Sequence, residues 1–324
     1  MSFEEVGHEW FVPWNSQSLS EWSRKHAHGK FVDLNGRSTH YVKRGAGEPL
    51  ILIHGFNMDV NTWINNIDAL AESHKVYGID LWGLGFSARD SVDPSFELYT
   101  EQLLSFMDTL DIQKATLVGH SMGGGTAISF AVRYPERVDR LVLVDSTGIP
   151  NPLPLRSKFF TLPGVGEFLM SINNNYFRRK NLRDIWFYEK DRITDQVFDK
   201  ITQFQKIEGS TEILLEILRK DFFHTLSDEI SQLNQLDLPI LVIWGRHDAS
   251  IPLEIGEEMH RLLEGSRFEV IENGGHMPNF DNPERFNRIV DDFLLEQQEP
   301  ARLSIPDRDP GPRQVGQGQP FPAR

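Results

Sequence analysis

Residues 115–127 read ATLVGHSMGGGTA, an apolar run that ends in Gly-x-Ser-x-Gly and continues into small residues. This pattern predicts a buried strand, a sharp turn and a helix in succession. Gly119 and Gly123 stand two positions on either side of Ser121, where larger side chains would collide with neighbouring backbone in such a turn. The stretch therefore predicts that Ser121 is a nucleophile held above the edge of a sheet.

The composition indicates a globular protein and limits its partners. The 324 residues are 39% hydrophobic and 25% charged, which suits one large domain with an insertion or two domains. The net charge of −14 argues against nucleic acid as a partner. The absence of cysteine excludes disulfides and thiolate metal sites. Because the chain has no signal-like start and no apolar run of spanning length, we expect a cytoplasmic location and no membrane span.

Apolar runs alternate with helical patterns along most of the chain. The dipeptide Asn35-Gly36 predicts a tight turn that joins the first two strands in an antiparallel hairpin. Strands are predicted at residues 30–34, 38–44, 49–56, 76–79, 115–120, 138–144, 239–245 and 268–271. A helix is predicted to begin behind Asn61 or Thr62. This alternation predicts an α/β fold with a mostly parallel central sheet flanked by helices on both faces.

Shifts in composition divide the chain into five segments. Residues 1–29 form an N-terminal arm, and 30–148 form the first part of the α/β core. Residues 149–237 contain helical stretches and many aromatic side chains but no convincing buried strand, which predicts a helical cap insertion whose aromatic residues pack together and partly line a pocket. The core resumes at 238–299. Residues 300–324 are rich in proline and glycine and are expected to form a disordered tail.

A serine hydroxyl needs a histidine to take its proton and a carboxylate to orient that histidine. Asp248 directly follows one predicted strand, and His276 follows the next in a glycine-rich loop. Because the carboxyl ends of parallel strands meet at one edge of the sheet, we expect both side chains near Ser121. The order nucleophile, acid, base also fits a known arrangement of this triad. Asp145 ends another strand and remains an alternative acid.

Acyl transfer also requires donors for the developing oxyanion. We expect these to be the backbone N–H groups of Met122, at the start of a helix, and of Phe56, in the turn after His54-Gly55. His54 itself is interpreted as a residue that tethers this turn, not as the base.

The chain resembles serine hydrolases of the α/β-hydrolase fold with an inserted helical cap, over residues 31–295. The resemblance rests on five motifs, which are HGF at 54–56, DLWGLGFS at 80–87, GHSMGG at 119–124, GRHD at 245–248 and GH at 275–276. It implies a triad of Ser121, Asp248 and His276 and an acyl-enzyme intermediate that water hydrolyses. It also implies that the enzyme needs no metal and no organic cofactor.

The resemblance leaves the substrate open. Ser121 argues against dehalogenases and epoxide hydrolases of this fold, which use aspartate. Hydrolases that cleave carbon–carbon bonds in meta-cleavage products typically carry Gly-Pro-Gly after the oxyanion His-Gly and tryptophan after the catalytic histidine, where this chain has residues 56–59, FNMD, and Met277. We therefore expect a carboxylesterase acting on small or medium apolar esters, with the carbon–carbon hydrolase as the alternative.

Other functions also fit the sequence. A cofactor-free perhydrolase or a proline aminopeptidase would also fit the triad, and a non-catalytic small-ligand receptor is the alternative from another class. In the cap, Arg183 or Arg192 could hold a substrate carboxylate, although a solvated surface charge is the favoured interpretation of both. The sequence carries no signal for the oligomeric state.

Overall fold

The computed structural model describes residues 12–90, 92–151, 155–172 and 175–296. The predicted tail at 300–324 and the first part of the arm lie outside these residues. Eight strands form one sheet in the order β1-β2-β4-β3-β5-β6-β7-β8. Their bounds are Lys30–Leu34 (β1), Arg37–Arg44 (β2), Pro49–Ile53 (β3), Lys75–Ile79 (β4), Ala115–His120 (β5), Val138–Val144 (β6), Ile240–Gly245 (β7) and Arg267–Ile271 (β8).

Six neighbouring strands of the sheet, from β4 to β8 in the order above, are parallel, and β2 alone runs in the opposite direction. β2 pairs antiparallel with both β1 and β4, whereas β3, β4, β5, β6, β7 and β8 pair in parallel. Asn35, at the hairpin turn, has a φ of 55°, and Gly36 follows with a φ of 85°, as a tight turn requires. The predicted mostly parallel sheet with an antiparallel entry hairpin is therefore confirmed.

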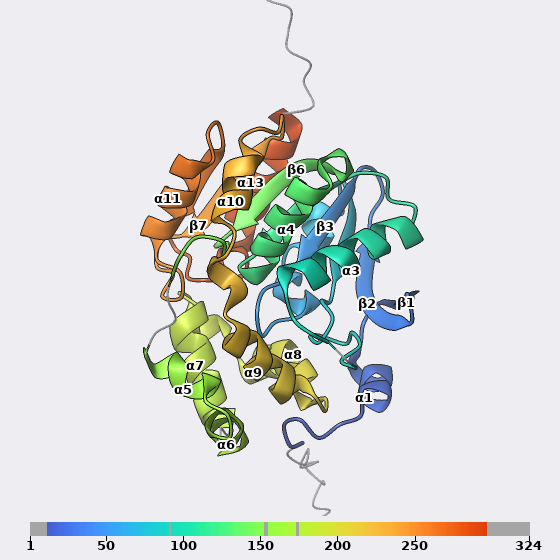
Figure 1. The fold of residues 1–324 in the computed structure, drawn as a ribbon, viewed down its shortest axis with the longest axis vertical. Helices are drawn as coiled ribbons and strands as arrows, with labels where there is room; N and C mark the ends of the chain where they lie inside the picture. Colours follow the sequence, from blue (N-terminus) through green and yellow to red (C-terminus); the bar gives the residue numbers. More distant parts are fainter. Residues whose placement is uncertain (1–11, 91, 152–154, 173–174, 297–324) are drawn as a thin grey trace, which may run out of the picture.

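Helices cover both faces of the sheet (Figure 1). The helices that flank or connect the strands are α1 (Leu19–His26), α2 (Ile67–Leu70), α3 (Phe96–Thr109), α4 (Met122–Arg133), α11 (Leu253–Leu262), α12 (Pro278–Asp281) and α13 (Pro283–Glu296). Among the described residues, none of the helices combines the length and apolar character that a bilayer span requires.

The two faces of the sheet belong to separate apolar clusters. Ile51 and Ile53 of β3 pack in the larger cluster, together with side chains of α3 and α4. Leu50 and Leu52 point to the other face and pack with Trp63 and the apolar stripe of α13. This division follows from the alternation of side chains along a strand. The buried core therefore holds the carboxyl ends of the central strands rigidly in place.

A helical segment separates β6 from β7 in the sequence although the two strands are neighbours in the sheet. Its helices are α5 (Leu155–Thr161), α6 (Val165–Ile172), α7 (Asn175–Trp186), α8 (Asp195–Thr202), α9 (Ser210–Lys220) and α10 (Ser227–Leu233). Most of them lie beyond one end of the sheet, in the lower half of Figure 1. The described part of the arm joins this segment, because the N–H groups of Ser16 and Gln17 donate to the carbonyl of Lys206 at 2.8 Å.

One predicted helix start differs from the structure. A short 3-10 turn, Val60–Trp63, precedes α2, and its N-cap is Asp59, whose carboxylate accepts a hydrogen bond from the N–H of Asn61. The expected caps, Asn61 and Thr62, lie inside that turn. Asp59 caps this turn because its side chain accepts a hydrogen bond from an N–H group that has no partner within the turn.

The packing of α13 on the sheet generates a stability prediction. Phe286 is fully buried in the cluster that α13 forms with Trp63 and β3. Phe286→Ala should lower the free energy of unfolding by about 3–5 kcal/mol, because the cavity left behind cannot collapse. Leu295→Ala on the same helix is the control: this side chain is 58% exposed, and its loss should cost less than about 1 kcal/mol. Urea denaturation measures both, and equal losses would contradict the assignment of α13 to the core.

Candidate active site

Ser121 lies at the turn between β5 and α4, in a backbone conformation that few residues adopt. Its φ is 52° and its ψ is −119°. A Cβ atom added at Gly119 would lie 2.3 Å from the carbonyl oxygen of Gly123, and one added at Gly123 would lie 2.3 Å from that of Ile53. The N–H of Ser121 donates to the carbonyl of Val144 at 2.9 Å. The turn is thus closely packed and places the buried side chain of Ser121 at the edge of the space above the sheet.

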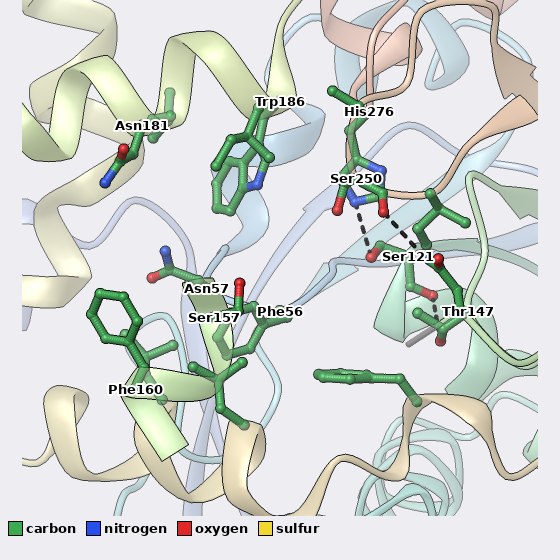
Figure 2. A pocket seen from close by; sticks show the side chains of 18 of the residues that line it. Phe56, Asn57, Ser121, Thr147, Ser157, Phe160, Asn181, Trp186, Ser250 and His276 are labelled. Atoms are coloured by element: carbon green, nitrogen blue, oxygen red, sulfur yellow. Dashed lines mark hydrogen bonds between the residues drawn. The ribbon is translucent and has the colours of Figure 1, made fainter. Parts of the chain in front are cut away.

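The structure brings together the three side chains that the sequence singled out. His276 Nε2 lies 3.1 Å from Ser121 Oγ, and His276 Nδ1 lies 2.7 Å from Asp248 Oδ2. The other oxygen of Asp248 accepts hydrogen bonds from the N–H groups of Ser250 and Ile251 at 2.7 and 2.9 Å. Figure 2 shows His276 beside Ser121 at one side of a pocket. Asp248 is therefore fixed by backbone donors and in turn orients the imidazole.

Asp145 lies near this group but does not contact His276 through a hydrogen bond. Its Oδ1 accepts a hydrogen bond from the N–H of Gly245 at 2.9 Å, while Oδ2 is buried without a partner among the described residues. Burial, followed by the nearby charge of Asp248, raises the pKa of Asp145 well above its usual value. The carboxyl group that contacts His276 is therefore that of Asp248, at 2.7 Å.

Three side chains of this group are of types that can also bind a metal ion. Among the residues that the structure describes, only Asp145, Asp248 and His276 place three possible ligand atoms within 4.8 Å of one another. The imidazole Nδ1 and the Asp248 carboxylate already share a hydrogen bond, and the remaining oxygen of Asp248 accepts two backbone N–H groups. These hydrogen bonds are the kind of arrangement that supports proton transfer during a reaction.

The structure adds a residue that the sequence reasoning missed. His120, directly before Ser121, is fully buried, and its Nε2 donates to the carbonyl of His276 at 2.5 Å. Burial, and then the neighbouring His276, lowers the pKa of His120 well below its usual value, so the ring is neutral. His120 thus attaches the loop that carries His276 to the turn that carries Ser121. Its position inside the Gly-x-Ser-x-Gly motif was the only signal in the sequence.

The predicted oxyanion donors lie on two elements beside Ser121. Met122 is the first residue of α4, and the first N–H groups of a helix have no partner within that helix. Phe56 follows the turn after β3, which His54 tethers as expected: its Nδ1 donates to the carbonyl of Gly55, and its Nε2 accepts from the N–H of Leu81 at 3.0 Å. Burial lowers the pKa of His54, which keeps the ring neutral for this double role.

A cavity of about 310 Å³ opens above Ser121 and His276. Most of its lining is apolar and comes from the helical segment, including Phe160, Leu182 and Trp186. The amides of Asn57 and Asn181 lie on the side of the pocket away from His276 (Figure 2). The cavity can therefore hold a largely apolar molecule that also carries a polar group.

The polar side of the cavity contains an arginine that the sequence did not single out. Arg178 is 8% exposed and donates to Gln205 Oε1 at 2.6 Å, and Gln205 donates to Asn57 Oδ1 at 2.9 Å. Burial lowers the pKa of Arg178 to about 10, which leaves it a cation at neutral pH. Neither Arg183 nor Arg192 is among the described residues that line the cavity.

The buried carboxyl of Asp145 generates a prediction about pH. Because its pKa is raised in the native state, the native protein binds this proton more tightly than the unfolded chain does. Its contribution to stability therefore falls as pH rises above the unfolded value of about 3.9. Asp145→Asn cannot titrate, so its free energy of unfolding should increase relative to wild type from about pH 4 towards pH 8. Urea denaturation across this range measures the difference, and a constant difference would show that the pKa of Asp145 is not raised in the native state.

The chain is similar to several known hydrolases. A family model for the alpha/beta hydrolase fold matches residues 48–283. A 2-hydroxy-6-oxononadienedioate/2-hydroxy-6-oxononatrienedioate hydrolase of Paraburkholderia phymatum is 33% identical over 79% of this chain and 90% of its own length. A solved meta-cleavage product hydrolase from Pseudomonas fluorescens IP01 is 29% identical, with a TM-score of 0.72 over 83% of this chain and 98% of that one.

A second similar solved structure is that of an esterase and not of a meta-cleavage product hydrolase. It is a thermophilic esterase from Thermogutta terrifontis, 26% identical, with a TM-score of 0.70 over 83% of this chain and 99% of that one. The family match extends from β3 to the start of α13 and so includes the strand ends that carry Ser121, Asp248 and His276. The chain belongs to the α/β-hydrolase fold family and is a hydrolase.

Proposed function

We propose that the protein is a serine hydrolase that acts through an acyl-enzyme, with Ser121 as nucleophile, His276 as general base and Asp248 as the acid that orients it. The observation that carries the proposal is the 3.1 Å contact between Ser121 Oγ and His276 Nε2 at the base of the cavity. A serine hydroxyl becomes an effective nucleophile when a base lies at this distance. The 2.7 Å contact with Asp248 holds the imidazole in the tautomer that can accept the proton.

The geometry supports a two-step reaction. Ser121 Oγ attacks the carbonyl carbon of the substrate while His276 Nε2 takes the hydroxyl proton, and the N–H groups of Phe56 and Met122 stabilise the oxyanion. The bond to the leaving group then breaks, and His276 returns the proton to that group. Water attacks the acyl-enzyme with His276 again as base, which releases the acid and restores the serine hydroxyl.

The favoured substrates are small or medium carboxylic esters. The mostly apolar lining of the cavity supports this choice, since it suits the alkyl or aryl parts of an ester. The residues after the oxyanion turn, Asn57, Met58 and Asp59, also lack the Gly-Pro-Gly run typical of carbon–carbon hydrolases, and Met277 stands where those enzymes have tryptophan. We propose that the substrates are small molecules and that the enzyme acts in the cytoplasm.

The second candidate is hydrolysis of a carbon–carbon bond in a meta-cleavage product. Two relatives carry such names, and the name of one describes a dienedioate, which has two carboxylates. Arg178, on the polar side of the cavity, supports this candidate because a buried cation suits a substrate carboxylate. It lies on α7 and therefore faces the site from the helical segment.

Substitution of the three proposed catalytic residues tests the mechanism. Ser121→Ala should lower kcat for p-nitrophenyl acetate by a factor of about 10⁴ or more, because the nucleophile is lost. Asp248→Asn should lower kcat about 10²- to 10⁴-fold, because an amide no longer selects the required tautomer. Asp145→Asn is the matched control and should change kcat by less than about tenfold, because the carboxyl group that contacts His276 is that of Asp248. The reverse ranking of the two aspartate variants would identify Asp145 as the acid.

A comparison of substrates separates the candidate activities. The ester hypothesis predicts that kcat/KM for short-chain p-nitrophenyl esters exceeds that for a coloured ring-fission dienolate, measured by its bleaching, by a factor of about 100 or more. Arg178→Met should then change ester hydrolysis little. Faster bleaching of the dienolate, with a large increase of KM in Arg178→Met, would favour the carbon–carbon hydrolase instead. Saturable binding of either compound without turnover would indicate a receptor.

A further inference from the structure

The helical segment exposes an unusual number of large apolar side chains. Of the eleven that are exposed among the described residues, six lie between positions 159 and 176, and the other five are scattered. We call these six the apolar patch; they are Phe159, Leu162, Val165, Phe168, Ile172 and Tyr176. Their helices, α5, α6 and the start of α7, lie at one end of the long axis of the molecule (Figure 1). Exposed apolar side chains concentrated in one segment of the chain mark a site of interaction.

The helix at the centre of this patch is apolar on more than one face. The sequence of α6, VGEFLMSI, contains one charged residue, Glu167. Its inner side packs on α9, where Gly166 lies against Leu215, and Met170 lines the cavity. Its outer side presents Phe168, which is 60% exposed, and Ile172, which is 56% exposed. A helix with apolar residues on all sides is normally covered on all sides. None of the residues that the structure describes covers the outer side of α6.

The charge around the apolar patch is opposite to that of the whole protein. Residues 155–186 contain six basic and two acidic residues, in a chain whose net charge is −14. Arg178 is buried at the cavity, so five of the six basic residues are left to contribute to the outer surface. Ion pairs join Glu167 to Arg219, Asp184 to Lys180 and Arg179 to Asp195, and the basic residues still outnumber the acidic ones. Lys158 is exposed directly beside Phe159. The patch therefore combines apolar side chains with a positive surrounding.

We propose that the apolar patch docks onto a lipid surface that carries anionic headgroups. Helices that lie in such an interface combine aromatic and aliphatic side chains with flanking lysine and arginine, as α5, α6 and α7 do. A second copy of the chain fits less well, because a symmetric pair would bring the two basic surroundings face to face. The net negative charge elsewhere in the protein would orient the molecule with this end towards the anionic surface.

The docking surface and the cavity share the same helices. Ser157 and Phe160 of α5, Met170 of α6 and Asn181 of α7 line the cavity from the side that carries the patch. On the proposed hydrolase function, docking would bring the roof of the cavity against a reservoir of apolar esters. The docking itself depends only on the exposed residues and not on the triad.

Co-sedimentation of the full chain with vesicles tests the proposal. The protein should bind vesicles that contain phosphatidylglycerol at least tenfold more tightly than vesicles of phosphatidylcholine alone, and added salt should weaken the binding. The double variant Phe168→Ser/Ile172→Ser should reduce binding at least tenfold. The matched control is Phe31→Ser/Leu295→Ser, whose side chains are 47% and 58% exposed outside the patch, and it should bind like wild type.

Unchanged hydrolysis of a soluble short-chain ester would show that the patch variant is folded. Ser121→Ala should bind vesicles like wild type, which separates a failure of docking from a failure of the proposed hydrolase function. Equal binding by wild type and the patch variant, or no binding to either kind of vesicle, would overturn the proposal. Sedimentation velocity tests the other occupant, a second copy of the chain. A dimer in wild type that is lost in the patch variant, together with no vesicle binding, would overturn the proposal, because the patch would then join two copies.

Discussion

The positive φ of Ser121 is the constraint on which the candidate site depends. A non-glycine residue adopts this conformation only when the surrounding structure enforces it. Here the enforcement comes from close contacts between the turn and the backbone of β3, and from the hydrogen bond between Ser121 and Val144 of β6. The central strands must therefore pair in their observed register before the hydroxyl can take its place. A change that destabilises the pairing of these strands should therefore also disturb the geometry of the site.

The topology explains why distant residues meet at this point. The strands β5, β6, β7 and β8 are consecutive neighbours in the sheet, and each is followed by a polar residue of the site. These residues are Ser121, Asp145, Asp248 and His276 in the order of the strands. Two carboxyl groups side by side would repel each other if both were ionised. The two carboxyl groups differ in their surroundings, because Asp248 receives two backbone donors and Asp145 receives one, and burial beside Asp248 raises the pKa of Asp145.

Much of this arrangement could be predicted from the sequence. The sheet followed from apolar runs of strand length, and the proximity of Ser121, Asp248 and His276 followed from their places at strand ends. The contact of His120 with the His276 loop could not be predicted, because it joins residues 156 positions apart through tertiary structure. The Asp59 cap was missed because several neighbouring polar residues are suitable caps by type.

The polar side of the cavity could not be predicted from the sequence either. Arg178, Gln205 and Asn57 come from three separate segments, and only the packing of the helical segment over the sheet brings them together. The exposed side of α6 could not be predicted either, because an apolar sequence predicts a buried helix unless the neighbours of that helix are known. Composition thus indicated the existence of the helical segment, whereas its functional surfaces required the structure.

The central claim is that Ser121 is activated by His276 as a nucleophile. Treatment of the full chain with a fluorophosphonate probe, followed by intact-mass measurement and peptide mapping, tests it most directly. One adduct should form on Ser121, and His276→Ala should slow its formation at least about 100-fold, because the base no longer removes the hydroxyl proton. An adduct on another residue, or labelling of Ser121 at an unchanged rate in His276→Ala, would contradict this claim.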